Sequence, residues 1–136
     1  MKTILQHSWH LLRRWGPPLA LMALIFFLSS RPKLPGPENP LWNLLVKKGG
    51  HFVVFGALAW LYVRALTDER PARARDYWLA WGLTLLYAIS DEFHQSFTPG
   101  RHPALSDVVI DQLGAATALL IHRWRSRKSA PAAPAP

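Results

Sequence analysis

The stretch Leu19–Leu28 (LALMALIFFL) contains no polar residue, and it decides which class of fold the chain can adopt. Three further segments are similarly apolar: 52–63 (FVVFGALAWLYV), 77–89 (YWLAWGLTLLYAI) and 108–121 (VVIDQLGAATALLI), the last interrupted by Asp111 and Gln112. Each is long enough for a helix and too uniformly apolar to keep one face in water. A bilayer core of about 30 Å needs about 20 helical residues, so each run needs its flanking residues to cross a membrane. The pattern predicts an all-α integral membrane protein, a four-helix transmembrane bundle. A soluble helical bundle is the alternative, because short apolar runs discriminate poorly.

Length and composition exclude several other classes of protein. A chain of 136 residues has room for one domain, which excludes an enzyme with a separate cofactor-binding domain. The absence of cysteine excludes a disulfide framework, a thiolate zinc site and a cysteine nucleophile. The combination of a net charge of +8 with 50% hydrophobic residues is unusual for a nucleic-acid-binding protein, whose basic residues gather on a polar face.

Prolines mark where the predicted helices begin and end. The first helix begins near Pro18, or earlier with a kink, because proline fits a first helical turn but bends a helix interior. Residues 31–40 (RPKLPGPENP) form a connector without regular structure, and 41–48 (LWNLLVKK) is predicted to be a short interfacial helix. Residues 98–101 (TPGR) predict a tight turn, and 129–136 (SAPAAPAP) a disordered Pro/Ala tail.

Basic residues are divided unevenly between the two ends of the predicted helices. Of the 16 Lys and Arg residues, 11 lie in the amino-terminal segment, the middle connector and the carboxyl-terminal segment. The other five lie in the two remaining connectors: Arg31, Lys33, Lys47, Lys48 and Arg101. Because cytoplasmic segments carry the excess of Lys and Arg, both termini and the middle connector are predicted to be cytoplasmic. Topology and contact with anionic lipid then explain the net charge without a nucleic-acid partner.

Acidic residues are concentrated at the opposite, extracytoplasmic ends of the predicted helices. Four of the eight acidic residues fall within 21 residues, between Asp91 and Asp111. Lys48 and His51, like Asp91 and His94, are three residues apart, and Asp107 and Asp111 are four apart, so each pair is expected to share a helix face. Ionisable groups at membrane depth are costly unless they pair or line a wet cavity, and they mark functional sites. The bundle is therefore expected to bring one polar set towards a single pocket: Lys48, His51, Asp91, Glu92, His94, Gln95, Arg101, Asp107 and Asp111.

Two segments that contain these residues carry a family pattern. Residues 48–58 (KGGHFVVFGAL) match Lys-x-x-His-Phe-x-x-aromatic-x-x-Leu, and 90–114 (SDEFHQSFTPGRHPALSDVVIDQLG) is similar to Asp-Glu-x-His-Gln, Pro-Gly-Arg and Asp-x-x-x-Asn-x-x-Gly in that order. The sequence thus resembles the VanZ-like family of small bacterial membrane proteins, named for a protein linked to resistance to the glycopeptide teicoplanin. Two positions depart from the pattern: Asp111 stands where Asn is usual, and Ala118 where a second Gly often follows.

The resemblance implies a VanZ-like transmembrane domain over residues 1–128, in the bacterial inner (cytoplasmic) membrane. The resemblance indicates a fold and a site, but it does not identify a reaction. It also suggests glycopeptide tolerance as a cellular role to test. The first hypothesis is an enzyme acting on a lipid-linked envelope substrate. The proton-transfer and orienting groups would be His51, Asp91, Glu92 and His94. The groups that hold an anionic headgroup or line the site would be Lys48, Gln95, Arg101, Asp107 and Asp111.

Three other hypotheses stay open. The His and carboxylate side chains suit a divalent metal, although the sequence has no HExxH pair and identifies no cofactor. The protein could instead bind an envelope component without catalysis, or its polar cluster could be a structural ion network. A carrier with an Asp and His proton relay is disfavoured, because four short helices leave little material for alternating access. The sequence is silent on the oligomeric state.

Overall fold

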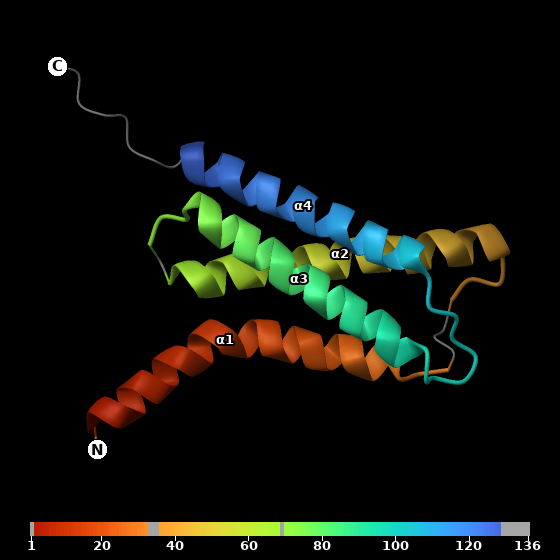
Figure 1. Ribbon diagram of the computed structural model, residues 1–136, viewed down its shortest axis with the longest axis horizontal. Helices are drawn as coiled ribbons and strands as arrows, with labels where there is room; N and C mark the ends of the chain where they lie inside the picture. Colours follow the sequence, from red (N-terminus) through yellow and green to blue (C-terminus); the bar gives the residue numbers. More distant parts are fainter. Residues whose placement is uncertain (1, 33–35, 69, 129–136) are drawn as a thin grey trace.

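The computed structural model describes residues 2–32, 36–68 and 70–128, and within these residues it has four α-helices and no strand. The helices are α1 (Lys2–Ser29), α2 (Pro40–Thr67), α3 (Ala74–Gln95) and α4 (Leu105–Lys128) (Figure 1). The predicted all-α class is confirmed. The predicted Pro/Ala tail, residues 129–136, lies outside the described residues.

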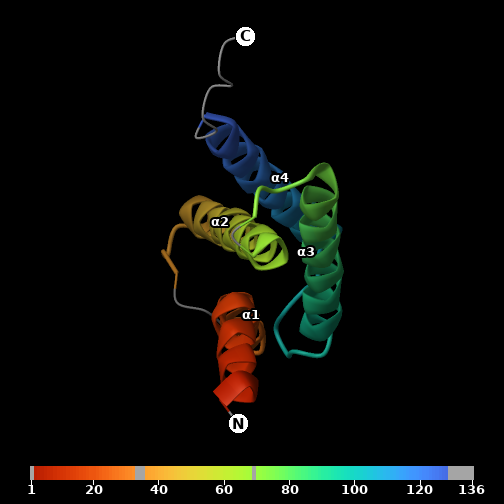
Figure 2. The ribbon, with the colours of Figure 1, turned by 90° about the vertical axis from the view of Figure 1, so that its left-hand side faces the viewer.

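Helix α2 is the centre of the arrangement. It packs most extensively against α4 and also contacts α3 and α1, whereas α1 lies at the edge against α2 and α3 (Figures 1 and 2). The side chains buried between the helices are mostly apolar, with Phe55, Leu58 and Val63 of α2 among the largest. Burying these side chains favours association of the helices, although in lipid close packing and hydrogen bonds contribute more than the hydrophobic effect.

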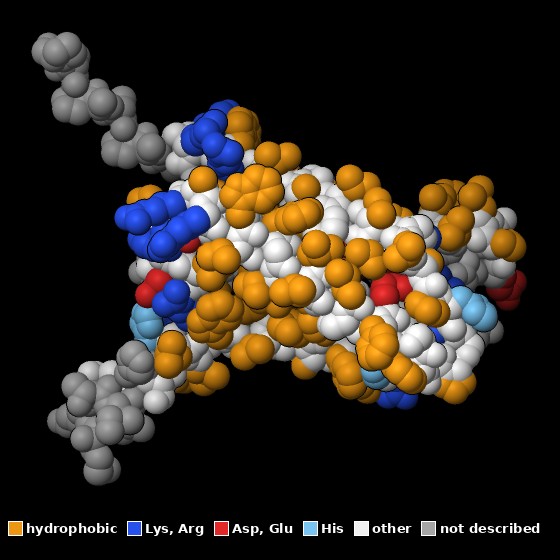
Figure 3. All heavy atoms as spheres, viewed as in Figure 1, with side chains coloured by type: hydrophobic (Ala, Val, Ile, Leu, Met, Phe, Trp, Pro, Cys, Tyr) orange, Lys and Arg blue, Asp and Glu red, His pale blue; other side chains and the backbone are white. Residues whose placement is uncertain are grey.

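The face of the molecule seen in Figure 3 is apolar over most of its middle and basic at one end. Figure 3 shows hydrophobic side chains covering the helices, with Lys and Arg gathered near the end of α4. Among the described residues, three helical segments are long and apolar enough to cross a membrane: Ser8–Ser29, Pro40–Thr67 and Leu105–Lys128. Helix α3 does not reach that level, because Arg75 and Asp76 lie at its start and Asp91 and Glu92 near its end.

The first helix begins before its prolines. Helix α1 runs from Lys2 through Pro17 and Pro18, and Figure 1 shows that its direction changes part-way along its length. Each proline removes a backbone N–H donor and crowds the preceding turn, which bends a helix. Of the two sequence-based alternatives, the structure therefore has the earlier start with a kink.

The short interfacial helix predicted at residues 41–48 is not a separate element. The side chain of Asn39 accepts hydrogen bonds from the backbone N–H groups of Leu41 and Trp42, and Pro40 occupies the first turn, so α2 starts there. The helix then continues through Gly49 and Gly50. Two glycines disfavour a helix by about 1 kcal/mol each, but in lipid a broken helix leaves polar backbone groups without partners.

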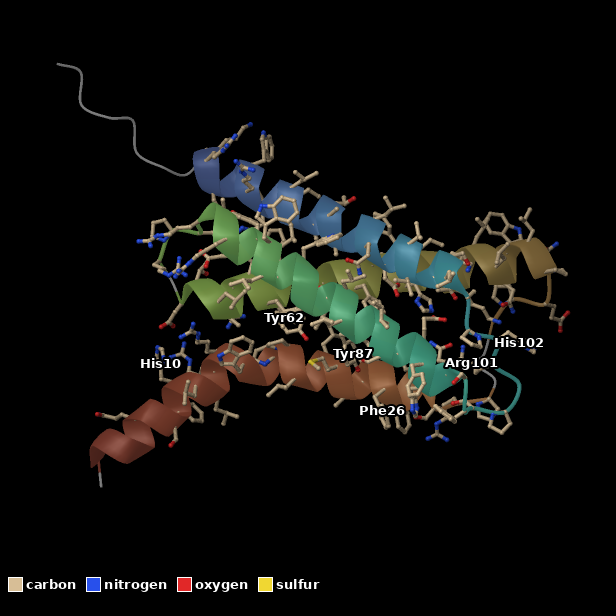
Figure 4. The ribbon with its side chains drawn as sticks, viewed as in Figure 1. His10, Phe26, Tyr62, Tyr87, Arg101 and His102 are labelled. Atoms are coloured by element: carbon tan, nitrogen blue, oxygen red, sulfur yellow. The ribbon has the colours of Figure 1, made fainter. Side chains whose placement is uncertain are left out.

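Hydrogen bonds from two tyrosines hold α1 against α2 and α3. Figure 4 shows Tyr62 and Tyr87 on the side of their helices that faces α1. The Tyr62 hydroxyl lies 3.0 Å from the Met22 sulfur, and the Tyr87 hydroxyl donates to the Met22 carbonyl at 2.5 Å. At the basic end, Arg14 of α1 donates to the carbonyls of Ala65 and Leu66. Helix α1 is thus fastened at both halves of its apolar segment.

Candidate functional site

The site is built on a very close approach of α2 and α4. A Cβ atom at Gly114 of α4 would overlap the backbone carbonyl of Phe52 in α2, and one at Gly56 would lie 3.0 Å from the Gly114 carbonyl oxygen. Only glycine allows two helix backbones to come this near, as at small-residue contacts in membrane proteins. The residues just before this contact on the two helices are therefore held face to face.

The outermost of these facing pairs is an ion pair. The Lys48 ammonium group of α2 donates to the Asp107 carboxylate of α4 and, at 3.1 Å, to the Ser106 hydroxyl. Both charged side chains are partly shielded from solvent. Lys48, predicted to hold an anionic headgroup, thus has a protein carboxylate as its partner.

The second facing pair joins a histidine to a buried carboxylate. His51 Nδ1 lies 3.0 Å from Asp111 Oδ1, and the exposed fractions of the two side chains are 21% and 1%. The Asp111 carboxylate accepts, so Nδ1 carries the proton of this hydrogen bond. The imidazole ring lies parallel to the Phe55 ring, with centroids 6.1 Å apart. Within the described part of the chain, His51 Nε2 and the buried Asp111 Oδ2 have no hydrogen-bond partner.

The end of α3 contributes two buried acids. Asp91 Oδ2 accepts a hydrogen bond from Gln95 Nε2 at 2.8 Å, one helical turn later. Glu92 Oε2 accepts from the backbone N–H of Ala104 at 2.7 Å, which ties the α3–α4 connector to α3. Both acids lie near enough to His51 for their charges to interact with it. The structure therefore brings Asp91, Glu92 and Gln95 to the same end of the molecule as His51.

Two predicted site residues face α1 instead. His94 Nε2 lies 3.0 Å from the Ser30 hydroxyl oxygen, and its ring centroid lies 4.3 Å from that of Phe26. Arg101, in the connector next to exposed His102 (Figure 4), donates to the carbonyls of Arg31 at 2.9 Å and Leu28 at 3.0 Å. Leu28 lies in the last turn of α1 and Arg31 follows the helix by two residues, so Arg101 sits at the end of α1 where the helix dipole favours a positive charge. His94 and Arg101 thus fasten α1 to α3 and the connector.

The family of the chain follows from a comparison of its sequence with known families. The family model described as VanZ/LLP1 matches residues 5–126, which is most of the chain. The chain belongs to the VanZ/LLP1 family. No curated protein and no solved structure matched it. Family membership and three apolar helices make this a VanZ-like membrane protein with several membrane-spanning segments.

The VanZ-like site also contains polar groups that the sequence did not single out. Ser106 and Ser30 are partners of Lys48 and His94, and the side-chain amide of Gln112 is buried without a hydrogen-bond partner among the described residues. The sequence could have identified Gln112, because a polar amide inside an apolar segment is energetically costly and such residues often belong to functional sites. In the described part of the chain, no three His, Asp or Glu side chains are grouped closely enough to hold a metal ion.

Proposed function

We propose that this VanZ-like protein acts on a lipid-linked component of the bacterial cell envelope, with His51 as the group that takes or gives a proton. Asp111 positions His51 in this proposal. The site lies at the extracytoplasmic end of the bundle, both termini are cytoplasmic, and the substrate comes from the outer leaflet of the inner membrane. The cellular role would be tolerance of glycopeptides such as teicoplanin.

One observation carries the proposal: the pairing of partly exposed His51 with fully buried Asp111. A carboxylate on Nδ1 fixes the tautomer of the imidazole and leaves Nε2 as the nitrogen that accepts a proton. When Nε2 is protonated, the same carboxylate stabilises the imidazolium. Histidine held in this way is suited to general acid–base catalysis at neutral pH.

The cations expected to hold an anionic headgroup do not carry the proposal. Lys48 is paired with Asp107, and Arg101 is bound to the carbonyls at the end of α1. These contacts favour one alternative, in which the polar cluster is structural and the protein binds or supports envelope components without catalysis. Removing a structural partner would then lower stability and leave the activity of each folded molecule unchanged.

The test compares His51 with His94, which has contacts of similar extent but faces α1. Variants His51→Ala and His51→Gln should lose teicoplanin tolerance per folded molecule in cells that express the protein, and any loss of stability from leaving Asp111 without a partner is measured separately. His94→Gln should reduce thermal stability in detergent but keep tolerance per folded molecule. If the two His51 variants retain full tolerance at matched amounts of folded protein, the proton-transfer role is wrong.

A further inference from the structure

A groove of about 310 Å³ lies where α3 ends and α4 begins. Its walls are apolar, with Ile89 and Phe93 on one side and Pro103 and Leu105 on the other, and it is also lined by Glu92. We refer to it as the Glu92 groove. It is separate from the α2–α4 interface that holds His51 and Asp111.

Among the described residues, only one of the two oxygens of the Glu92 carboxylate has a hydrogen-bond partner. The Glu92 side chain is buried, with 8% of the residue exposed, and Oε2 is engaged by the Ala104 N–H. Oε1 is also buried, but it has no hydrogen-bond partner within the described part of the chain. Buried acceptors are almost always paired, and an orphaned carboxylate oxygen is costly. Glu92 lines the groove, so a rotation of its side chain would present this unpaired acceptor to a donor from outside the protein.

The donor comes from the membrane rather than from water. Phe93 and Leu105 at the rim have exposed fractions of 68% and 87%, as expected for side chains that face lipid. Figure 3 shows acidic atoms surrounded by hydrophobic side chains near the junction of α3 and α4. A ligand that fits this surface has apolar chains alongside Phe93 and Leu105 and a hydrogen-bond donor at headgroup level.

We propose that the Glu92 groove binds an aminophospholipid through its primary ammonium group, with phosphatidylethanolamine as the simplest such lipid. An ammonium N–H supplies both the hydrogen bond that Oε1 lacks and a charge opposite to that of the carboxylate. The charges that act on Glu92 come from Asp107, His51 and Asp91, so acids outnumber bases around the carboxylate, which disfavours a net anionic headgroup. This inference names a ligand for the membrane protein proposed above, but it depends on Glu92 and not on proton transfer by His51.

The experiment measures lipid binding to the full-length protein by native mass spectrometry from detergent micelles. The probes are phosphatidylethanolamine, phosphatidylcholine and phosphatidylglycerol with identical acyl chains. Phosphatidylcholine retains the positive charge but has no N–H donor. We expect phosphatidylethanolamine to bind roughly tenfold more tightly than phosphatidylcholine, the ratio that a charged hydrogen bond commonly provides.

Two variants separate the headgroup from the chains. Glu92→Gln places an amide N–H₂ at the position of the orphaned oxygen, so the preference for phosphatidylethanolamine should disappear. Glu38→Gln, at an exposed glutamate in the α1–α2 connector, is the matched control and should keep it. Phe93→Ala should weaken the binding of phosphatidylethanolamine and phosphatidylcholine alike, because it removes an apolar wall and leaves the carboxylate in place.

Several results would overturn the inference. Equal binding of the three lipids to the wild-type protein would show that the groove has no headgroup selectivity. Tighter binding of phosphatidylcholine would indicate recognition of a quaternary ammonium by Phe93, and tighter binding of phosphatidylglycerol an anion site. His51→Ala should retain the preference for phosphatidylethanolamine, so this inference and the proton-transfer proposal fail in different measurements.

Discussion

Gly114 of α4 lies directly against the main-chain carbonyl of Phe52 in α2, with no room for even a methyl group between the helices. This contact sets the distance between α2 and α4. His51 precedes Phe52 by one residue, and Asp111 precedes Gly114 by three, so the same contact determines whether the two side chains meet. The geometry of the proposed catalytic pair thus depends on a residue that has no functional group.

The first prediction concerns this glycine. Gly114→Ala should lower stability by about 1–3 kcal/mol, the usual cost of overpacking, because the helices must move apart. Gly82→Ala in α3 is the control, since a Cβ atom there meets nothing within 4 Å and alanine is the better helix former. Thermal unfolding in detergent measures both. If Gly114→Ala is as stable as Gly82→Ala, the close approach does not exist in the protein.

Much of this architecture could be predicted from the sequence because the signals are local. Apolar runs separated by prolines indicated the helices, and charges at their ends indicated which polar residues share an end. The pairs Lys48 with His51 and Asp107 with Asp111 lie on matching faces of α2 and α4, as their spacings of three and four imply.

The destinations of His94 and Arg101 could not be predicted in the same way. Asp91 and His94 are three residues apart and were expected to face one pocket, but Asp91 contacts Gln95 while His94 contacts α1. Side chains three positions apart on a helix point in somewhat different directions, so each can contact a different neighbouring helix. Arg101 is bound to α1 carbonyls some seventy residues earlier in the chain, and only the tertiary arrangement brings these groups together.

The second prediction separates the charge of Asp111 from its hydrogen bond. Asp111→Asn keeps an oxygen that accepts from His51 Nδ1, so stability should stay within about 1 kcal/mol of wild type. It removes the charge that stabilises the imidazolium, so teicoplanin tolerance per folded molecule should fall between wild type and His51→Ala. Asp111→Ala removes both and should match His51→Ala. A fully active Asp111→Ala protein would contradict the role proposed for this residue.

The third prediction treats Lys48 and Asp107 as a structural pair. In a double-mutant cycle with Lys48→Met and Asp107→Asn, we expect a coupling energy of about 1 kcal/mol, typical of residues in direct contact. The double variant should recover part of the stability lost by Lys48→Met alone, because no charge is left unpaired. Chemical unfolding in detergent micelles gives the four values. Additive effects would show that the two side chains do not interact.

The fourth prediction concerns the attachment of α1. Arg101→Ala should lower stability by about 1–3 kcal/mol, because two hydrogen bonds from a charged group to the end of α1 are lost. Its neighbour His102 is exposed, and His102→Ala should have no effect on unfolding. Tolerance per folded molecule should be unchanged in both. Loss of tolerance by well-folded Arg101→Ala would return this residue to the functional site.

The last prediction is topological, and it also tests whether α3 crosses the membrane although its composition is less apolar than that of the other helices. The chain has no cysteine, so single cysteines can be placed in each connector without a background signal. Exposed positions are available at Glu38 between α1 and α2, at Ala74 at the start of α3, and at His102 between α3 and α4. The excess of Lys and Arg predicts that the middle connector is cytoplasmic.

A membrane-impermeant maleimide should therefore label Glu38→Cys and His102→Cys in intact cells, and Ala74→Cys only after the membrane is opened. Labelling of Ala74→Cys alone would invert the orientation and place His51 at the cytoplasmic face. Equal behaviour of Ala74→Cys and His102→Cys would mean that α3 does not cross.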